Sequence, residues 1–221
     1  MTRSTGTRSP ARRERCEHMI AIVDYGVGNL FSLSSSLRAL GLETEITHDA
    51  DRLRAAERII LPGVGAFGDA RDKLDATGLV PVLREEAEKK PLLGICLGMQ
   101  LLFDHSFEYG EHAGLGFVPG QVVDLRENLS DKTLTVPLMG WYSLQIEKDD
   151  PLFKYFEDGE YVYYVHSFYA RNCAESTLGT SEYGNVAVTG VVRSGNVWGT
   201  QFHPEKSGDA GLRLLRAFAE L

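Results

Sequence analysis

The pattern of apolar and polar positions changes character near residue 103. Before that point, short apolar runs alternate with segments whose apolar residues recur at helical spacing. The expected strands cover residues 19–23, 43–47, 59–61 and 92–95, and the expected helices cover residues 51–56, 79–89 and the stretch through Leu33, Leu37 and Leu40. Strands that alternate with helices join through right-handed crossovers, so this half predicts a parallel sheet with helices on both faces.

The second half of the chain predicts strands without long helices between them. The candidate strands cover residues 120–125, 144–146, 161–165, 185–192 and 196–201, and a closing helix covers 208–221. The turn residues 193–195 join the last two strands into an expected hairpin. The fold class is therefore α/β, with an open, mixed, mainly parallel sheet flanked by helices and a largely antiparallel later half. Without an internal repeat or linker, residues 19–221 are expected to form one domain.

Composition narrows the function classes. Residues 1–18 carry five Arg and two Glu without apolar periodicity, which is typical of a disordered extension. The net charge of −8 disfavours general nucleic-acid binding. The sequence contains no run of 18 apolar residues, so no membrane span is expected. The three cysteines have no zinc or redox spacing, and an odd number is a poor disulfide framework, so a reducing, cytoplasmic location is expected. No metal or cofactor is expected.

Cys96 stands between Gly94 and Gly98, where an apolar strand passes into a helical pattern. A side chain on so sharp a turn projects from the sheet edge, and small neighbours are needed because the backbone folds tightly around it. The first N–H groups of the following helix favour a thiolate, the form that attacks. The alternative is an inert core cysteine, because free Cys is among the most buried residue types.

Two other segments complete a candidate site. His203 and Glu205 follow the apolar pair Val197-Trp198, at a spacing that lets the carboxylate orient the imidazole while the imidazole takes a thiol proton. Upstream, residues 58–67 form an apolar strand that ends in a Gly-rich loop, a source of backbone N–H groups for an oxyanion. Together the three segments predict a Cys-His-Glu triad.

These residues carry a family resemblance. Gly-Ile-Cys-Leu-Gly-Met-Gln at 94–100, Pro-Gly-Val-Gly-Ala-Phe at 62–67 and Phe-His-Pro-Glu-Lys-Ser at 202–207 resemble the motifs of class I glutamine amidotransferases. Asp-Tyr-Gly-Val-Gly-Asn-Leu at 24–30 and Tyr-Val-His-Ser-Phe at 164–168 resemble, within that family, the glutaminase subunits of imidazole glycerol phosphate synthase. The resemblance runs from about residue 19 to the C-terminus.

The resemblance implies an activity and a partner. Glutamine would be hydrolysed to glutamate and ammonia through a Cys thioester. The ammonia would pass to a (β/α)8-barrel cyclase in a heterodimer, which makes imidazole glycerol phosphate and aminoimidazole carboxamide ribotide in histidine biosynthesis. Other readings are a glutaminase of a different synthase, a cysteine hydrolase that does not turn over glutamine, and a non-catalytic binding module.

The resemblance also implies a role for each matched residue. The catalytic residues would be Cys96, His203 and Glu205, and the oxyanion would be held by backbone N–H groups of Gly63, Val64 and Leu97. The residues that hold glutamine would be Gln100, Glu108, His166, Ser167 and Phe168, and those that contact the cyclase would be Asn29, Trp141 and Lys206. By their residue types alone, Gln100 and Glu108 are also compatible with a solvated surface, and His166 and Trp141 with the core.

One stretch, residues 136–142, departs from the family pattern. Leu138 stands where the family usually carries His, and Tyr142 stands where it usually carries Asn, whereas Met139, Gly140 and Trp141 match. The departure concerns the expected contact with the cyclase and leaves the triad intact.

Overall fold

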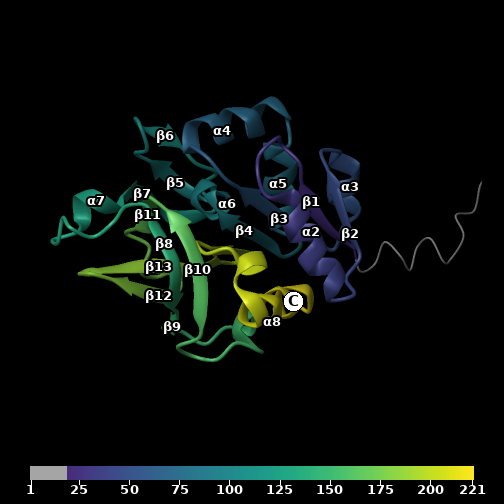
Figure 1. Cartoon of the computed structure of the whole chain (residues 1–221). Helices are drawn as coiled ribbons and strands as arrows, with labels where there is room; N and C mark the ends of the chain where they lie inside the picture. The colour runs from purple at the N-terminus through teal and green to yellow at the C-terminus, as the bar shows by residue number, and fades with distance from the viewer. Residues whose placement is uncertain (1–18) are drawn as a thin grey trace, which may run out of the picture.

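A computed structural model describes residues 19–221 (Figure 1). The expected extension at residues 1–18 lies outside the described residues. An eight-stranded sheet runs through the molecule, in the order β2-β1-β3-β4-β14-β13-β12-β9. Its strands are β1 (Ile20–Val23), β2 (Thr44–Thr47), β3 (Arg58–Gly63), β4 (Leu92–Cys96), β9 (Gln145–Ile146), β12 (Thr177–Tyr183), β13 (Val186–Ser194) and β14 (Val197–Thr200).

The strand directions divide this sheet into two halves. The five strands from β2 to β14 pair in parallel, and the remaining pairs, from β14 to β9, are antiparallel. The expected hairpin between β13 and β14 is present, with Ser194 opposite Val197. The sequence prediction of a mixed sheet with a parallel first half and an antiparallel later half is confirmed.

Two smaller sheets take up other strands of the later half. One pairs β8 (Leu138–Ser143) with β10 (Tyr161–His166), and the other has the order β11-β7-β5-β6. The strands of the second are β5 (Phe103–Ser106), β6 (His112–Ala113), β7 (Val118–Asp124) and β11 (Phe168–Arg171). The predicted strands at 120–125 and 161–165 therefore form, but they lie outside the main sheet.

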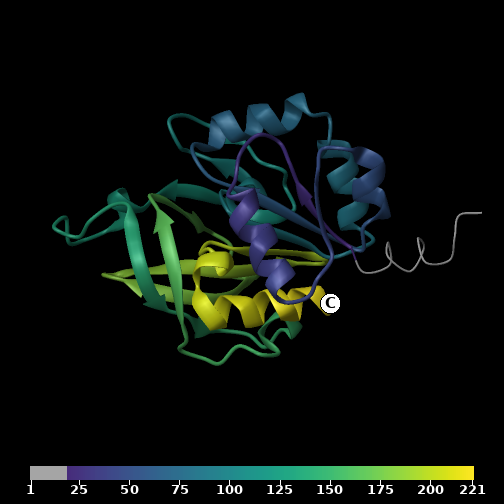
Figure 2. The same ribbon diagram turned by 45° about the vertical axis from the view of Figure 1, so that its right-hand side comes forward.

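Helices cover both faces of the parallel half. The helices are α2 (Leu30–Ala39), α3 (Ala50–Ala55), α4 (Phe67–Ala76), α5 (Val80–Ala87), α6 (Leu97–Leu101), α7 (Leu125–Asn128) and α8 (Gly208–Ala219). Ile20 and Ile22 of β1 share one core with α2 and α8, whereas Ala21 and Val23 share the other with α3, α4 and α5. Figure 2 shows α2 and α8 side by side on their face. None of the described helices is long and apolar enough to cross a membrane.

Candidate active site

Cys96 occupies a strained turn between β4 and α6. Its backbone has φ +55° and ψ −110°, in the left-handed region that side chains other than glycine rarely adopt. Such a conformation costs on the order of 1–3 kcal/mol and persists only where the surrounding structure enforces it. The start of α6 packs tightly against β3 here, because a Cβ atom at Gly98 would lie 1.9 Å from the carbonyl oxygen of Leu61. The turn thus has the geometry expected of a nucleophile elbow.

Gly98→Ala should separate α6 from β3 and destabilise the fold. The added methyl has backbone as its nearest neighbour, so we expect the free energy of unfolding to fall by about 3 kcal/mol, the upper part of the overpacking range. Urea denaturation followed by circular dichroism measures the change. Gly195→Ala is the comparison, because position 195 has open space around it and bears only the strain of φ +58°, whereas Gly98 has no positive φ and bears only the steric cost. Equal losses in the two variants would contradict the steric argument.

The base comes from the neighbouring strand. β14 pairs in parallel with β4, with Thr200 opposite Ile95, and His203 follows immediately beyond it. The backbone N–H of His203 donates to the carbonyl oxygen of Tyr163 at 3.0 Å, which fixes the turn. His203 Nδ1 lies 2.9 Å from Glu205 Oε1, and each side chain is only 3% exposed. The ring and Cys96 line the same cavity and interact electrostatically.

The charge state of His203 follows from these contacts. Burial by itself lowers the pKa of His203, but the hydrogen bonds to Cys96 and Glu205 and the negative charges of those groups outweigh burial and raise the pKa to about 10. At neutral pH the site therefore holds a cationic imidazole beside the sulfur. Such a group can give a proton to a leaving amine.

A cavity of about 310 Å³ opens on the sulfur. Its walls include Cys96, His203, Val64, Leu97, Lys206 and all the residues that the sequence predicts to hold substrate, Gln100, Glu108, His166, Ser167 and Phe168. Residues from distant parts of the chain thus converge on one concave surface. Gln100 and Glu108 are both buried, so the surface reading of these two residues is wrong.

The polar groups of this cavity are oriented by the backbone. Gln100 Nε2 donates to the carbonyl oxygen of Phe168 at 2.9 Å, and Glu108 Oε2 accepts from the N–H of Phe67 at 2.7 Å. Burial raises the pKa of Glu108, while the N–H of Phe67 and the charge of His112 oppose that rise. Within residues 19–221 no hydrogen bond engages the second carboxylate oxygen of Glu108, so it can accept from a cationic ligand.

His166 combines features of a core residue and a site residue. Its Nδ1 donates to the carbonyl oxygen of Phe168 at 2.9 Å, whereas its Nε2 is buried without a partner among the described residues. Burial, together with the charge of His203, lowers the pKa of His166 to about 4 despite the opposing bond to Phe168. The ring is therefore neutral at neutral pH, with an acceptor nitrogen at the cavity wall.

Comparison with known proteins identifies the family. Residues 21–220 match the family described as Glutamine amidotransferase class-I. The chain belongs to the class I glutamine amidotransferases. It is 47% identical over 204 residues to imidazole glycerol phosphate synthase subunit HisH of Listeria monocytogenes serotype 4a, which covers 92% of this chain and 96% of the relative. It is 46% identical over 205 residues to the subunit of the same name from Wolinella succinogenes, covering 92% and 100%. The predicted resemblance is confirmed.

Solved structures support the fold of this amidotransferase. A crystal structure of a glutamine amidotransferase superposes with a TM-score of 0.70 at 22% identity, covering 90% of this chain and 97% of the other. PurLQS from Thermotoga maritima gives the same TM-score and identity, covering 92% and 98%. At this identity the likeness concerns the fold alone.

The Gly-rich loop of the amidotransferase lies against the elbow. Gly63 ends β3 opposite Cys96, and a Cβ atom at Gly63 would lie 2.6 Å from the backbone nitrogen of Gly98. The hydroxyl of Tyr25 donates to the carbonyl oxygen of Pro62 at 2.6 Å and anchors the start of the loop. Val64, 41% exposed, lines the cavity. The expected oxyanion residues are thus adjacent to the nucleophile.

The predicted partner residues lie around the same site. Lys206 lines the cavity and is exposed, and Asn29 borders a small void of about 10 Å³ next to Glu205. Trp141 is 50% exposed and meets Tyr163 edge-on, so it is not a core tryptophan. These positions fit an exposed surface beside the cavity.

The two departures from the family pattern lie beneath that surface. Leu138 is buried opposite His166, where β8 pairs with β10. The ring of Tyr142 meets those of Tyr164 and Tyr183 edge-on and packs against the core. The substituted residues therefore contribute chiefly to packing under the patch that carries Trp141.

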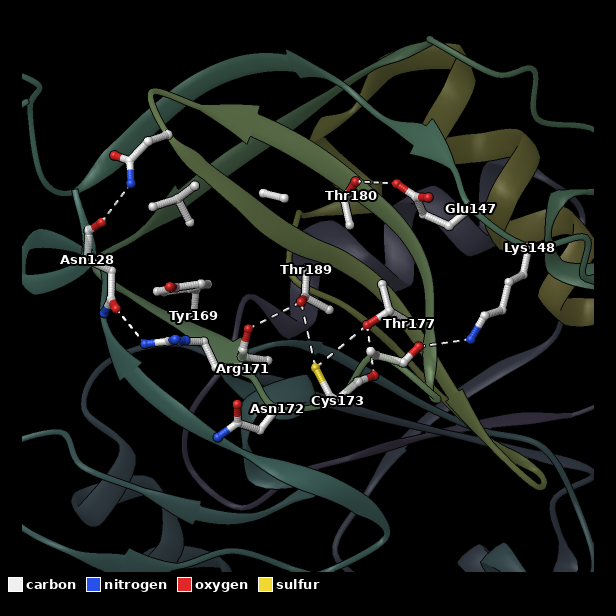
Figure 3. A pocket seen from close by; sticks show the side chains of 15 residues that line it. Asn128, Glu147, Lys148, Tyr169, Arg171, Asn172, Cys173, Thr177, Thr180 and Thr189 are labelled. Carbon is white, nitrogen blue, oxygen red and sulfur yellow. Dashed lines mark hydrogen bonds between the residues drawn. The ribbon is translucent and has the colours of Figure 1, made fainter. Parts of the chain in front are cut away.

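A larger cavity of about 570 Å³ lies elsewhere, between β11 and the β12–β13 hairpin (Figure 3). It shares no lining residue with the active-site cavity. Its cations are engaged within the protein: Lys148 donates to the carbonyl oxygens of Ala174 and Glu175, and Arg171 donates to Asn128. Cys173, a second buried thiol, contacts only threonine hydroxyls there among the side chains drawn.

Sequence reasoning missed one buried polar side chain at the active site. Gln201 is fully buried, accepts a hydrogen bond from Gln100 at 3.1 Å, and lies with its Nε2 3.8 Å from Cys96 Sγ. The available signal was a lone amide between Val197-Trp198 and His203. Nothing in the local sequence distinguishes this amide from a surface residue.

Proposed function

We propose that this chain is the glutaminase subunit that supplies ammonia for imidazole glycerol phosphate synthesis. The observation that carries the proposal is the cavity that Cys96 and His203 share with Glu108, an acceptor for a cation, while Glu205 contacts the far nitrogen of His203 at 2.9 Å. The high identity to HisH subunits over nearly the whole chain supports the specific role. A cytoplasmic location suits a nucleophile that must stay a free thiol.

Glutamine binding uses the groups that remain free in the cavity. Both N–H groups of Gln100 are engaged by Phe168 and Gln201, so only its Oε1 is left for a ligand. This oxygen and Glu108 accept hydrogen bonds from the α-ammonium group of glutamine. Main-chain groups of residues 166–168 hold the α-carboxylate.

Acylation follows from the positions of the triad. Cys96 attacks the side-chain amide carbon, and a C–S bond forms as the oxygen becomes an oxyanion. The backbone N–H of Leu97 and those of Gly63 and Val64 hold the oxyanion, and one such donor is worth about 2.7–4 kcal/mol of barrier. The imidazolium of His203 protonates the amide nitrogen, the C–N bond breaks and ammonia leaves.

Deacylation reverses the proton flow. Neutral His203 takes a proton from water as the water oxygen attacks the thioester carbon. The C–S bond then breaks, glutamate leaves, and the sulfur and the imidazolium return to their starting states. Glu205 holds His203 in one tautomer throughout and stabilises its cation.

The partner proposed for this chain is a (β/α)8-barrel cyclase that docks over the cavity and receives the ammonia. Val64 at the cavity and Met139 and Trp141 are large apolar side chains left exposed, with Met139 57% exposed. Both Met139 and Trp141 stand on β8. Large exposed apolar side chains near an active site are typical of a docking surface. Docking there would shield ammonia from water.

Glutamate release measured from the chain alone, with the cyclase, and with the cyclase plus its nucleotide ligand tests the proposal. If docking sets the loop at Gly63 and Val64 so that it supplies one oxyanion donor, activation should reach about 10²–10³-fold. Trp141→Ala or Lys206→Ala should weaken it, whereas Ile46→Ala, an exposed residue on the distant edge strand β2, should not. Equal rates in all three mixtures indicate a constitutive glutaminase, and no glutamate in any mixture refutes the function. Activation only by a different synthase assigns another pathway.

A further inference from the structure

A chain of buried amide groups connects the substrate cavity to the nucleophile. It begins at the carbonyl oxygen of Phe168, runs through Gln100 and Gln201, and ends at Cys96 Sγ. Gln100, Gln201 and Cys96 are all buried: Cys96 ends β4, Gln100 lies in α6, and Gln201 follows the last residue of β14. Gln201 is also fixed by its backbone, because its N–H donates to the carbonyl oxygen of Gly190 at 2.9 Å.

The carbonyl oxygen of Phe168, where this series of amide groups begins, determines the direction of every hydrogen bond in the series. A backbone carbonyl can only accept, so the group of Gln100 that meets Phe168 at 2.9 Å must be its NH₂. The second N–H of that NH₂ points to Gln201 at 3.1 Å, which must therefore present its oxygen. The NH₂ of Gln201 is then left to face Cys96 Sγ, at 3.8 Å.

We propose that Gln201 is a positioning residue that donates a hydrogen bond to Cys96 Sγ and favours the reactive thiolate, and that Gln100 fixes the orientation of this donor. The inference deepens the proposed glutaminase function and rests on it for its catalytic meaning. A donor matters at this sulfur because hydrogen bonds to a charged group stabilise the charged form. The same Gln100 offers its Oε1 to glutamine, so one side chain contacts the ligand and sets the donor to the nucleophile.

Other charged groups also act on the sulfur and remain in the variants proposed below. Tyr25, from the loop after β1, and His203, after β14, interact electrostatically with Cys96. Glu205 acts through His203, while Glu108, His166 and Lys206 line the same cavity. A change in the pH dependence of Cys96 reactivity when only Gln201 is replaced can therefore be attributed to the amide group of Gln201.

The test is the pH dependence of alkylation of Cys96 by iodoacetamide in the full chain. The Cys96 peptide is quantified by mass spectrometry, so that Cys173 does not contribute. Gln201→Met removes the donor at similar volume, and the midpoint of the profile should rise by about one pH unit, the equivalent of a tenfold loss of thiolate. Gln201→Leu gives the same measurement with a smaller side chain. Gln145→Met, at an exposed position, should leave the midpoint unchanged.

Two further variants distinguish a hydrogen-bond chain from simple packing. Gln100→Met should raise the midpoint by less than Gln201→Met, because the donor remains but loses its fixed orientation. The double variant should match Gln201→Met alone, since groups in series are not additive. An unchanged midpoint in folded Gln201→Met and Gln201→Leu overturns the inference, and additive shifts overturn the serial arrangement.

Steady-state kinetics of the complex with the cyclase completes the test. Gln201→Met should lower kcat about tenfold with a small change in KM, whereas Gln100→Met should raise KM. A merely structural role would lower the melting temperature without moving the alkylation midpoint. The alkylation assay needs no glutamine, so its outcome is separate from that of the proposed function. If the wild-type complex releases no glutamate, the proposed function is refuted. A midpoint shift in the Gln201 variants would still establish the hydrogen bond.

Discussion

Cys96→Ala should abolish glutamine-dependent product formation by the complex with the cyclase while leaving synthesis from added ammonium salts intact. The substitution removes the sulfur that forms the thioester, and nothing else in the 310 Å³ cavity can replace it as a nucleophile at that position. We expect the glutamine-dependent rate to fall by about 10⁶-fold, as for loss of the nucleophile in a hydrolytic triad. The measurement compares product formed from glutamine with product formed from ammonium.

Cys173→Ala is the matched control for this experiment. Cys173 is also a free, buried thiol, but it lies in the other cavity against Thr177 and Thr189. Its removal should leave both activities unchanged. Loss of both activities in Cys96→Ala would show that Cys96 chiefly supports the fold, a result that an accompanying fall in melting temperature would corroborate.

Glu205→Gln should reduce glutamine hydrolysis on the order of 10²–10⁴-fold with little change in overall structure. The amide keeps the shape of the carboxylate but loses the charge that stabilises the His203 imidazolium, and it no longer enforces one tautomer. The exposed pair His105 and Glu111 offers a control, because Glu111→Gln breaks a similar contact outside the cavity. That control should retain full activity.

The same variant should change how stability depends on pH. The folded-state pKa of His203 is raised from 6.5 to about 10, so the pairing stabilises the fold fully below about pH 6.5 and is lost as pH rises toward 10. The wild-type melting temperature should therefore fall across that window more steeply than in Glu205→Gln, where one source of the raised pKa is missing. Parallel profiles for the two chains would show that Glu205 does not hold the proton on His203.

Sequence reasoning succeeded where burial alone determines the local structure. The strands β1, β3 and β4 are apolar on both faces and were predictable from their composition. By contrast, β12 carries polar residues such as Thr180 and Glu182, and its register shifts at Gly179, so its hydrophobic pattern is broken. Pairing with β13 and β9, rather than its own pattern, makes this segment a strand.

The same distinction applies to helices and to sheet membership. Helix α4 buries only Phe67, Ala70 and Leu74 among charged residues, and the Gly-rich loop before it obscures its start. The placement of β8 and β10 in a separate sheet depends on contacts between segments distant in sequence. Local propensity carries no information about that choice.

For the site, sequence motifs identified the residues that perform chemistry but not those that orient them. Cys96, His203 and Glu205 stand in short recognisable segments, and the structure brings them together. Tyr25 donates a hydrogen bond to Pro62, and Gln201 bonds both Gln100 and Cys96, all across long separations in sequence. Such contacts follow only from the three-dimensional arrangement.

The position of β14 in the main sheet has a consequence for biosynthesis of the protein. This strand inserts between β4 and β13, and the residues it brings to the nucleophile come late in the chain, with Gln201 following Cys96 by 105 residues. Contacts between such distant segments form slowly, because the intervening chain must first be ordered. A nascent chain that has emerged only as far as the elbow therefore possesses a thiol without its base. Assembly of the triad therefore requires that the segment carrying His203 has been synthesised and that β14 has paired with β4.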